Sequence, residues 1–127
     1  MNTNSFLNLA NELEHVGLLW HPEIGDEISS KDSGNLSILV DPQGLTPLEL
    51  RRNFLWLPSI EQMIYQCEAR QAVLVHAGLE MNEKALGYKA VVKAQFGEIE
   101  AMAFSLRETM GLVLRDVILG MRRGDMH

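Results

Sequence analysis

Hydrophobic residues recur at steps of three and four along the first twenty positions of the chain. The intervening positions are mostly asparagine, glutamate and histidine. This spacing gives a helix one apolar face, which packs on a protein core. It predicts an amphipathic helix over residues 4–19, with a buried stripe that consists of Phe6, Leu9, Ala10, Leu13, Val16 and Trp20.

A broader apolar stripe of the same period lies near the C-terminus. Ser105 and Glu108 precede it at the spacing of a capping box, in which both side chains accept hydrogen bonds from backbone N–H groups of the first helical turn. Arg122 and Arg123 end the segment, where the helix dipole favours positive charge. We expect a closing helix followed by a frayed tail at 124–127, with a buried face formed by Leu106, Met110, Val113, Leu114, Val117, Ile118 and Met121.

Two further capping boxes occur in the middle of the chain. Thr46 pairs with Glu49, with a proline at the favoured first helical position, and Ser59 pairs with Gln62. Pro58 separates the two segments, because the residue before a proline is disfavoured in a helix. The pattern predicts a short helix after Thr46 and a longer one that ends near residue 70.

Three other segments have the composition or the alternation of β-strands. Residues 36–40 form a short apolar run, and residues 72–76 form a β-branched run that we interpret as a buried strand. Residues 88–96 and 98–101 alternate between apolar and polar side chains on either side of Gly97, which predicts a hairpin. The helix-favouring Ala, Lys, Gln and Glu residues in this stretch leave a helix over 88–104 as the alternative.

The order of these elements indicates the fold class. Residues 21–34 and 80–87 are expected to be loops. We expect one α+β domain over residues 1–127, with a three- to four-stranded, mainly antiparallel sheet packed by the N- and C-terminal amphipathic helices. The pattern does not decide the order of the strands.

Composition excludes several classes of protein. A chain of 127 residues can bury one hydrophobic core, and its net charge of −6 argues against nucleic-acid binding. The single cysteine, Cys67, excludes an internal disulfide and a multi-thiolate zinc site. We see neither a secretory signal nor an apolar run of membrane-spanning length. We therefore expect a cytoplasmic protein that binds neither nucleic acid nor membrane.

The run Phe54-Leu55-Trp56-Leu57-Pro58-Ser59-Ile60-Glu61-Gln62 carries a resemblance. It is similar to the start of a helix in small uncharacterised phage- and prophage-type proteins, where a Trp-Leu-Pro run precedes an acidic residue and a glutamine. The resemblance covers about fifteen residues. It implies a compact α+β fold and a bacterial or phage origin, and it implies no activity and no functional residue.

The segment Trp20–Glu27 contains one imidazole and three carboxylates. Such groups bind divalent cations or act as a general acid and base. His76 is a further candidate base or ligand at the end of its strand. The alternative is a solvated acidic loop anchored by Trp20, with a hydrogen-bonded His76 at the margin of the sheet. The candidate ligand or metal residues are His21, Glu23, Asp26, Glu27 and His76.

Two other groups of residues have a chemical and a structural interpretation. Cys67 lies on the apolar stripe of its helix, which favours a small buried hydrophobe over a nucleophile. Arg51 and Arg52, close to Trp56, suit a phosphate or a carboxylate. Because adjacent residues do not share a helix face, we expect at least one of these arginines only to solvate the surface.

The functional prediction rests on the absence of catalytic motifs and on large apolar residues outside the main helical stripes. We find no phosphate-binding loop, dinucleotide fingerprint or nucleophile elbow. We therefore expect a non-catalytic binding or assembly module, without a cofactor, that associates with itself or with a protein partner. The candidate interface residues are Leu112, Leu119 and Trp56. The alternative is a small enzyme, or a ligand- or metal-binding domain, that uses residues 21–27.

Overall fold

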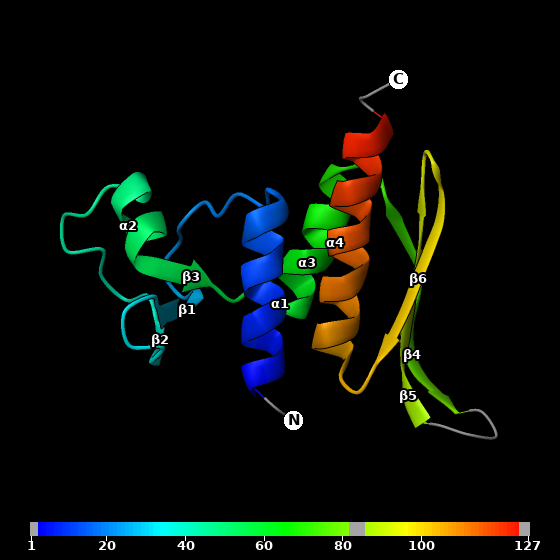
Figure 1. The fold of residues 1–127 in the computed structure, drawn as a ribbon, viewed down its shortest axis with the longest axis horizontal. Helices are drawn as coiled ribbons and strands as arrows, with labels where there is room; N and C mark the ends of the chain where they lie inside the picture. The colour runs from blue at the N-terminus through cyan, green and yellow to red at the C-terminus, as the bar shows by residue number, and fades with distance from the viewer. Residues whose placement is uncertain (1–2, 82–85, 125–127) are drawn as a thin grey trace.

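Four helices and two three-stranded antiparallel sheets make up residues 3–81 and 86–124, the part of the chain that the computed structural model describes (Figure 1). This confirms the α+β class, with two sheets in place of the single sheet predicted. The elements are α1 (Thr3–Val16), β1 (Glu27–Ser30), β2 (Leu36–Ile38), α2 (Pro47–Asn53), β3 (Phe54–Trp56), α3 (Ile60–Ala69), β4 (Val73–Met81), β5 (Leu86–Ala94), β6 (Gly97–Ala103) and α4 (Leu106–Gly124).

The first sheet has the strand order β2-β1-β3. Ile28 of β1 stands opposite Ser37 of β2 on one side and Trp56 of β3 on the other. The prediction of a loop over 21–34 was wrong for β1. Strands of three or four residues show little alternation of their own, and β1 forms because residues distant in sequence pair with it.

Helices α2 and α3 begin where the capping boxes predict. The Thr46 hydroxyl accepts a hydrogen bond from the backbone N–H of Glu49 (3.2 Å), and the Glu49 carboxylate accepts one from that of Thr46 (3.1 Å). Ser59 and Gln62 exchange the same two bonds at 3.1 and 2.8 Å. These bonds satisfy donors that the first helical turn leaves unpaired.

The second sheet has the order β4-β5-β6. Strands β5 and β6 form the hairpin predicted at Gly97, and the alternative helix over 88–104 is wrong. Strand β4 extends to Met81, beyond the predicted end at residue 76, and β5 begins at Leu86, so the predicted loop over 80–87 is shorter. Its residues 82–85 lie outside the described residues.

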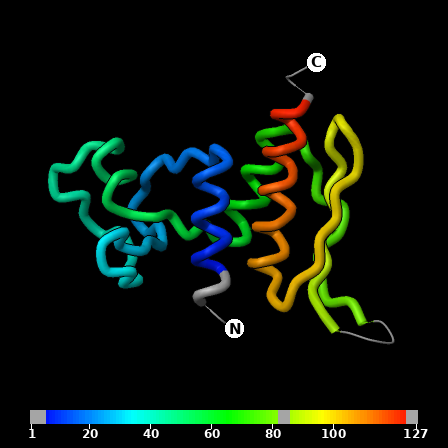
Figure 2. The backbone as a smooth tube through the Cα atoms, viewed as in Figure 1, coloured from blue at the N-terminus to red at the C-terminus, as the bar shows by residue number. Residues whose placement is uncertain are grey.

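Helix α4 lies between this sheet and the rest of the chain (Figure 1). It packs against β5 and β6 on one side and against α1 and α3 on the other. Figure 2 shows α1 and α4 running side by side, with the first sheet at the far end of the molecule. Helix α1 therefore packs mainly on α4, and it also contacts β3 of the first sheet. One core connects both halves, and its fully buried residues include Leu13, Leu57, Met63, Cys67, Val92, Met110 and Leu114.

Arg107, in the first turn of α4, joins four parts of the fold. Its guanidinium donates to the backbone carbonyls of Leu57 (2.7 Å) and Pro58 (3.0 Å), which precede α3. It lies 3.0 Å from a carboxylate oxygen of Glu27 in β1 and 4.3 Å from the centre of the Phe6 ring in α1. One side chain thus fixes α4 to both the first sheet and α1.

In the described part of the chain, no helix has the length and the unbroken apolar sequence needed to cross a membrane.

Candidate functional site

The structure places the five candidate ligand residues in three locations. His21, Glu23 and Asp26 line one cavity of about 380 Å³, beside α3. Glu27 lies near the start of α4, where Arg107 binds its carboxylate. His76 lies on β4 in the other sheet, with its Nε2 3.3 Å from a carboxylate oxygen of Glu80. The fold therefore brings together three of the five residues.

Asp26 is 5% exposed and acts as an acceptor for three donors. One carboxylate oxygen accepts from the Trp20 indole N–H (2.8 Å) and the Glu23 backbone N–H (2.9 Å), and the other accepts from the Gln62 amide (2.8 Å). Buried carboxylates are tolerated when they are hydrogen-bonded in this way. The arrangement anchors the loop before β1 to the start of α3. Among the residues that the structure describes, no cluster of His, Cys, Asp or Glu side chains is arranged to hold a metal ion.

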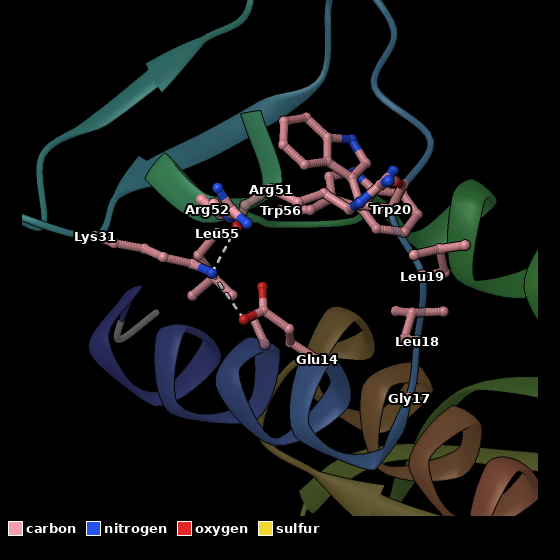
Figure 3. Close-up of a pocket in the computed structure, with 11 residues that line it drawn as sticks. Glu14, Gly17, Leu18, Leu19, Trp20, Lys31, Arg51, Arg52, Leu55 and Trp56 are labelled. Atoms are coloured by element: carbon pink, nitrogen blue, oxygen red, sulfur yellow. Dashed lines mark hydrogen bonds and ion pairs between the residues drawn. The ribbon is translucent and has the colours of Figure 1, made fainter. Parts of the chain in front are cut away.

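A second cavity, of about 320 Å³, lies between α1, the linker after it, α2 and β3 (Figure 3). Its apolar wall includes Leu18, Leu55 and the only two tryptophans of the chain, Trp20 and Trp56. The indole Nε1 of Trp56 is buried and has no hydrogen-bond partner in the described part of the chain.

The rim of this cavity carries three cations and one carboxylate. Both Arg51 and Arg52 line it, and Arg52 is exposed, which agrees with the expectation that at least one of the two lies at the surface. The Lys31 ammonium donates to the Glu14 carboxylate (2.8 Å) and to the Arg51 carbonyl (2.7 Å), as the dashed lines in Figure 3 show. Arg51 itself donates to the carbonyl of Trp20 (2.9 Å). Lys31 and Arg51 therefore connect the elements of this wall, so these two cations have a structural role.

The predicted interface residues are largely covered within the chain itself. Trp56 is 8% exposed and belongs to the core. Leu112 is half-buried and packs against the core, and Leu119 on the same helix is half-buried. Cys67 is fully buried, as its position on the apolar stripe predicts, and desolvation raises the pKa of its thiol to about 11. A buried thiol with a raised pKa is a poor nucleophile.

Exposed apolar residues lie on β2 and just after it, at Leu36, Ile38 and Val40, and along the longer strand β4 of the second sheet. Strand β4 has nine residues, all of them described, and none is buried. Val73, Val75, Leu79 and Met81 are each at least half exposed, and Met81 is 80% exposed. Within residues 72–76 only Ala72, which precedes β4, is buried. The prediction of a buried strand is therefore wrong for the single chain, because α4 packs over β5 and β6 while α3 packs near β4.

The free edge of β4 adds unpaired backbone groups to this apolar surface. Strand β4 pairs with β5 on one side, and within the described residues nothing pairs with it on the other. The sequence signal for the full strand was the continued alternation of Ala77-Gly78-Leu79-Glu80-Met81, in which small residues obscure the period of two.

Comparisons with protein-family models, with curated proteins and with solved structures found no match to this chain. The resemblance of residues 54–62 to phage-type proteins stays a prediction.

Proposed function

We propose that this protein is a non-catalytic binding or assembly module that associates through the free edge of β4. The observation that carries the proposal is a nine-residue strand, apolar for most of its length, in which no residue is buried. Exposed apolar residues that adjoin one another are typical of protein interaction sites. An unpaired strand edge also offers a row of N–H and C=O groups to an incoming strand.

The opposite edge of the sheet is built differently, which supports the choice of β4. Strand β6 presents Glu98 and Glu100 on the outer face, and α4 packs against its inner face. Glu100 also approaches Lys89 of β5 at 3.7 Å. Outward charges protect a sheet edge from pairing with another strand, and α4 covers the apolar face of the sheet at β5 and β6. Strand β4 has a bulge between Leu74 and His76 and one His–Glu pair, and its remaining exposed length is apolar.

The sequence itself supports burial of this strand in an assembly. Residues 72–76 have the β-branched, apolar composition of a strand covered on both sides. The fold leaves that strand uncovered, so a partner supplies the missing contact in this proposal. A cytoplasmic location is part of the proposal, and the free, buried thiol of Cys67 fits a reducing compartment.

Native mass spectrometry of the protein purified from its own cells tests the proposal. We expect a mass above 14.3 kDa, because at least one further chain occupies β4. Leu79→Lys places a charge on the exposed apolar surface and should return the mass to 14.3 kDa. Ile24→Lys is the matched control, because Ile24 is equally apolar and 72% exposed but lies between α1 and β1.

Two results would contradict the proposal. One is a mass of 14.3 kDa for the unmodified protein at every concentration, with no associated chain. The other is an assembly that Leu79→Lys leaves intact, or that Ile24→Lys disrupts to the same degree.

A further inference from the structure

We infer that the occupant of the β4 edge is a second copy of this chain, paired antiparallel about a two-fold axis through Gly78. This inference rests on the proposed function and names its partner. In a two-fold dimer the same patch serves both copies, so it must be complementary to itself. The residues from Val75 to Met81 meet this requirement in one register.

The pairing of β4 with β5 shows which side chains share a face. His76, Gly78 and Glu80 stand opposite Val91, Lys89 and Gly87 of β5, and they form the outer face. Ala77 and Leu79 stand opposite Ala90 and Tyr88, and they lie on the inner face with the core. Residues paired across two antiparallel strands must lie on the same face.

Complementarity between the His76 ring and the Glu80 carboxylate selects the register among those that keep the faces matched. An axis through Gly78 places His76 opposite Glu80 of the second copy, twice in the dimer. An axis through His76 would place His76 opposite itself, and an axis through Glu80 would place Glu80 opposite itself. An axis through Ala77 or Leu79 would place one of the two polar residues opposite Gly78. A carboxylate can accept a hydrogen bond from a histidine ring directly across a strand pair, whereas two carboxylates in the same position repel each other.

Gly78 is suited to the position on the axis. Within one chain the side chains of His76 and Glu80 approach one another on the outer face, above the strand (3.3 Å). A Cβ at Gly78 would lie 3.9 Å from the His76 ring, so the absence of a side chain leaves room there. In the dimer the two His–Glu pairs lie next to each other across the axis, with imidazole rings and carboxylates alternating around Gly78.

The same register covers three of the apolar residues that β4 exposes, Val75, Leu79 and Met81. Ala77 stands opposite Leu79 of the second copy on the inner face, and Val75 stands opposite Met81. The bulge between Leu74 and His76 ends the regular alternation, so the pairing stops near Val75. The β4-β5-β6 sheet of one copy and that of the other become one continuous sheet, and both free β4 edges are removed.

Disulfide trapping tests this register. In Gly78→Cys the two cysteines face each other across the axis, and opposite Cα atoms of antiparallel strands are about 4.5–5.5 Å apart, within the range of a disulfide. The native Cys67 is buried and does not compete. We expect mild oxidation to convert Gly78→Cys to a covalent dimer. Lys93→Cys, on the outer face of the central strand β5, is the control and should stay uncrosslinked.

A second trap covers the case in which Gly78→Cys fails to fold. His76→Cys and Glu80→Cys, mixed in equal amounts, should form a mixed disulfide dimer. Each variant alone should form far less of the disulfide dimer. Its two cysteines lie on opposite sides of the axis and are separated by four residue positions along the strands.

The outcomes separate the register from the proposed function. A homodimer that Leu79→Lys dissociates, but that neither trap crosslinks, overturns the register and leaves association through β4 standing. A complex with a different chain overturns the second copy as partner. A single chain at every concentration overturns both proposals.

Discussion

Arg107 allows the clearest quantitative test of how α4 is held to α1 and to the first sheet. We expect Arg107→Met, which keeps the length of the side chain and removes its charged donors, to lower the free energy of unfolding by about 2–4 kcal/mol. The variant loses the hydrogen bonds to the carbonyls of Leu57 and Pro58, the ion pair with Glu27 and the contact with the Phe6 ring.

The magnitude follows from these contacts. A hydrogen bond from a charged donor contributes about 1.5–3 kcal/mol, and two are lost. The ion pair involves a Glu27 side chain that is about one-third exposed, so it adds less than about 1 kcal/mol. The contact with Phe6 adds about 0.5–2 kcal/mol. Water reaches the freed carbonyls in part, which brings the expected total below the sum.

Urea unfolding followed by tryptophan fluorescence measures the effect. Trp20 and Trp56 both lie in the half of the molecule that Arg107 fixes to α4. The measurement uses a Leu79→Lys background, because association would make the apparent stability depend on concentration. Arg107→Lys should lose part of the stability, since an ammonium cannot reproduce the fork of a guanidinium.

Arg115→Met is the matched control. Its guanidinium contacts Glu12 and Asp116 at 3.3 and 3.2 Å near the surface, so its loss should cost less than about 1 kcal/mol. The reasoning is refuted if Arg107→Met unfolds within about 0.5 kcal/mol of the parent, or if Arg115→Met costs as much.

Three further predictions concern the core. Gly111→Ala should lower stability by about 1–3 kcal/mol in urea unfolding, because its Cβ would lie 2.5 Å from a Leu9 methyl group; an unchanged midpoint would show that α1 and α4 adjust freely. The Cys67 thiol has a pKa of about 11 when folded against 9.0 as its ordinary value, so the unfolded chain loses the proton first as pH rises. The stability present below pH 9 should therefore fall by up to about 3 kcal/mol between pH 9 and 11, and a Cys67→Val variant should lack that part of the loss. Asp26→Asn should cost about 1–3 kcal/mol, because the Asn amide would point a donor at the Gln62 amide; full parental stability in urea would contradict the anchoring role.

Local chemistry made much of the fold predictable from the sequence. The boxes at Thr46 and Ser59 act within a single helical turn, so sequence alone located the starts of α2 and α3. Strands β1 and β3 were missed because the pairing of Ile28 with Trp56 joins residues far apart in sequence. Periodicity describes one element at a time, and it does not show which elements will pair.

The same limit applied to the candidate site. His21, Glu23 and Asp26 lie within six residues of one another, and proximity in sequence was enough to place them in one cavity. Glu27 is drawn away by Arg107, a contact that only the packing of α4 creates. The exposure of β4 was hidden for a related reason. The apolar composition of a strand indicates that its side chains are buried in the functional state. It does not identify the helix or the chain that buries them.

The Gln62 side chain restricts natural variation more than its capping role suggests. Capping boxes accept either Glu or Gln at this position. Here the Gln62 side-chain oxygen accepts from the Ser59 N–H while its amide nitrogen donates to the buried carboxylate of Asp26. A glutamate would preserve the first bond and set two carboxylates against each other. Related chains that carry Glu at this position should therefore carry Asn in place of Asp26, so the two positions should change together during evolution.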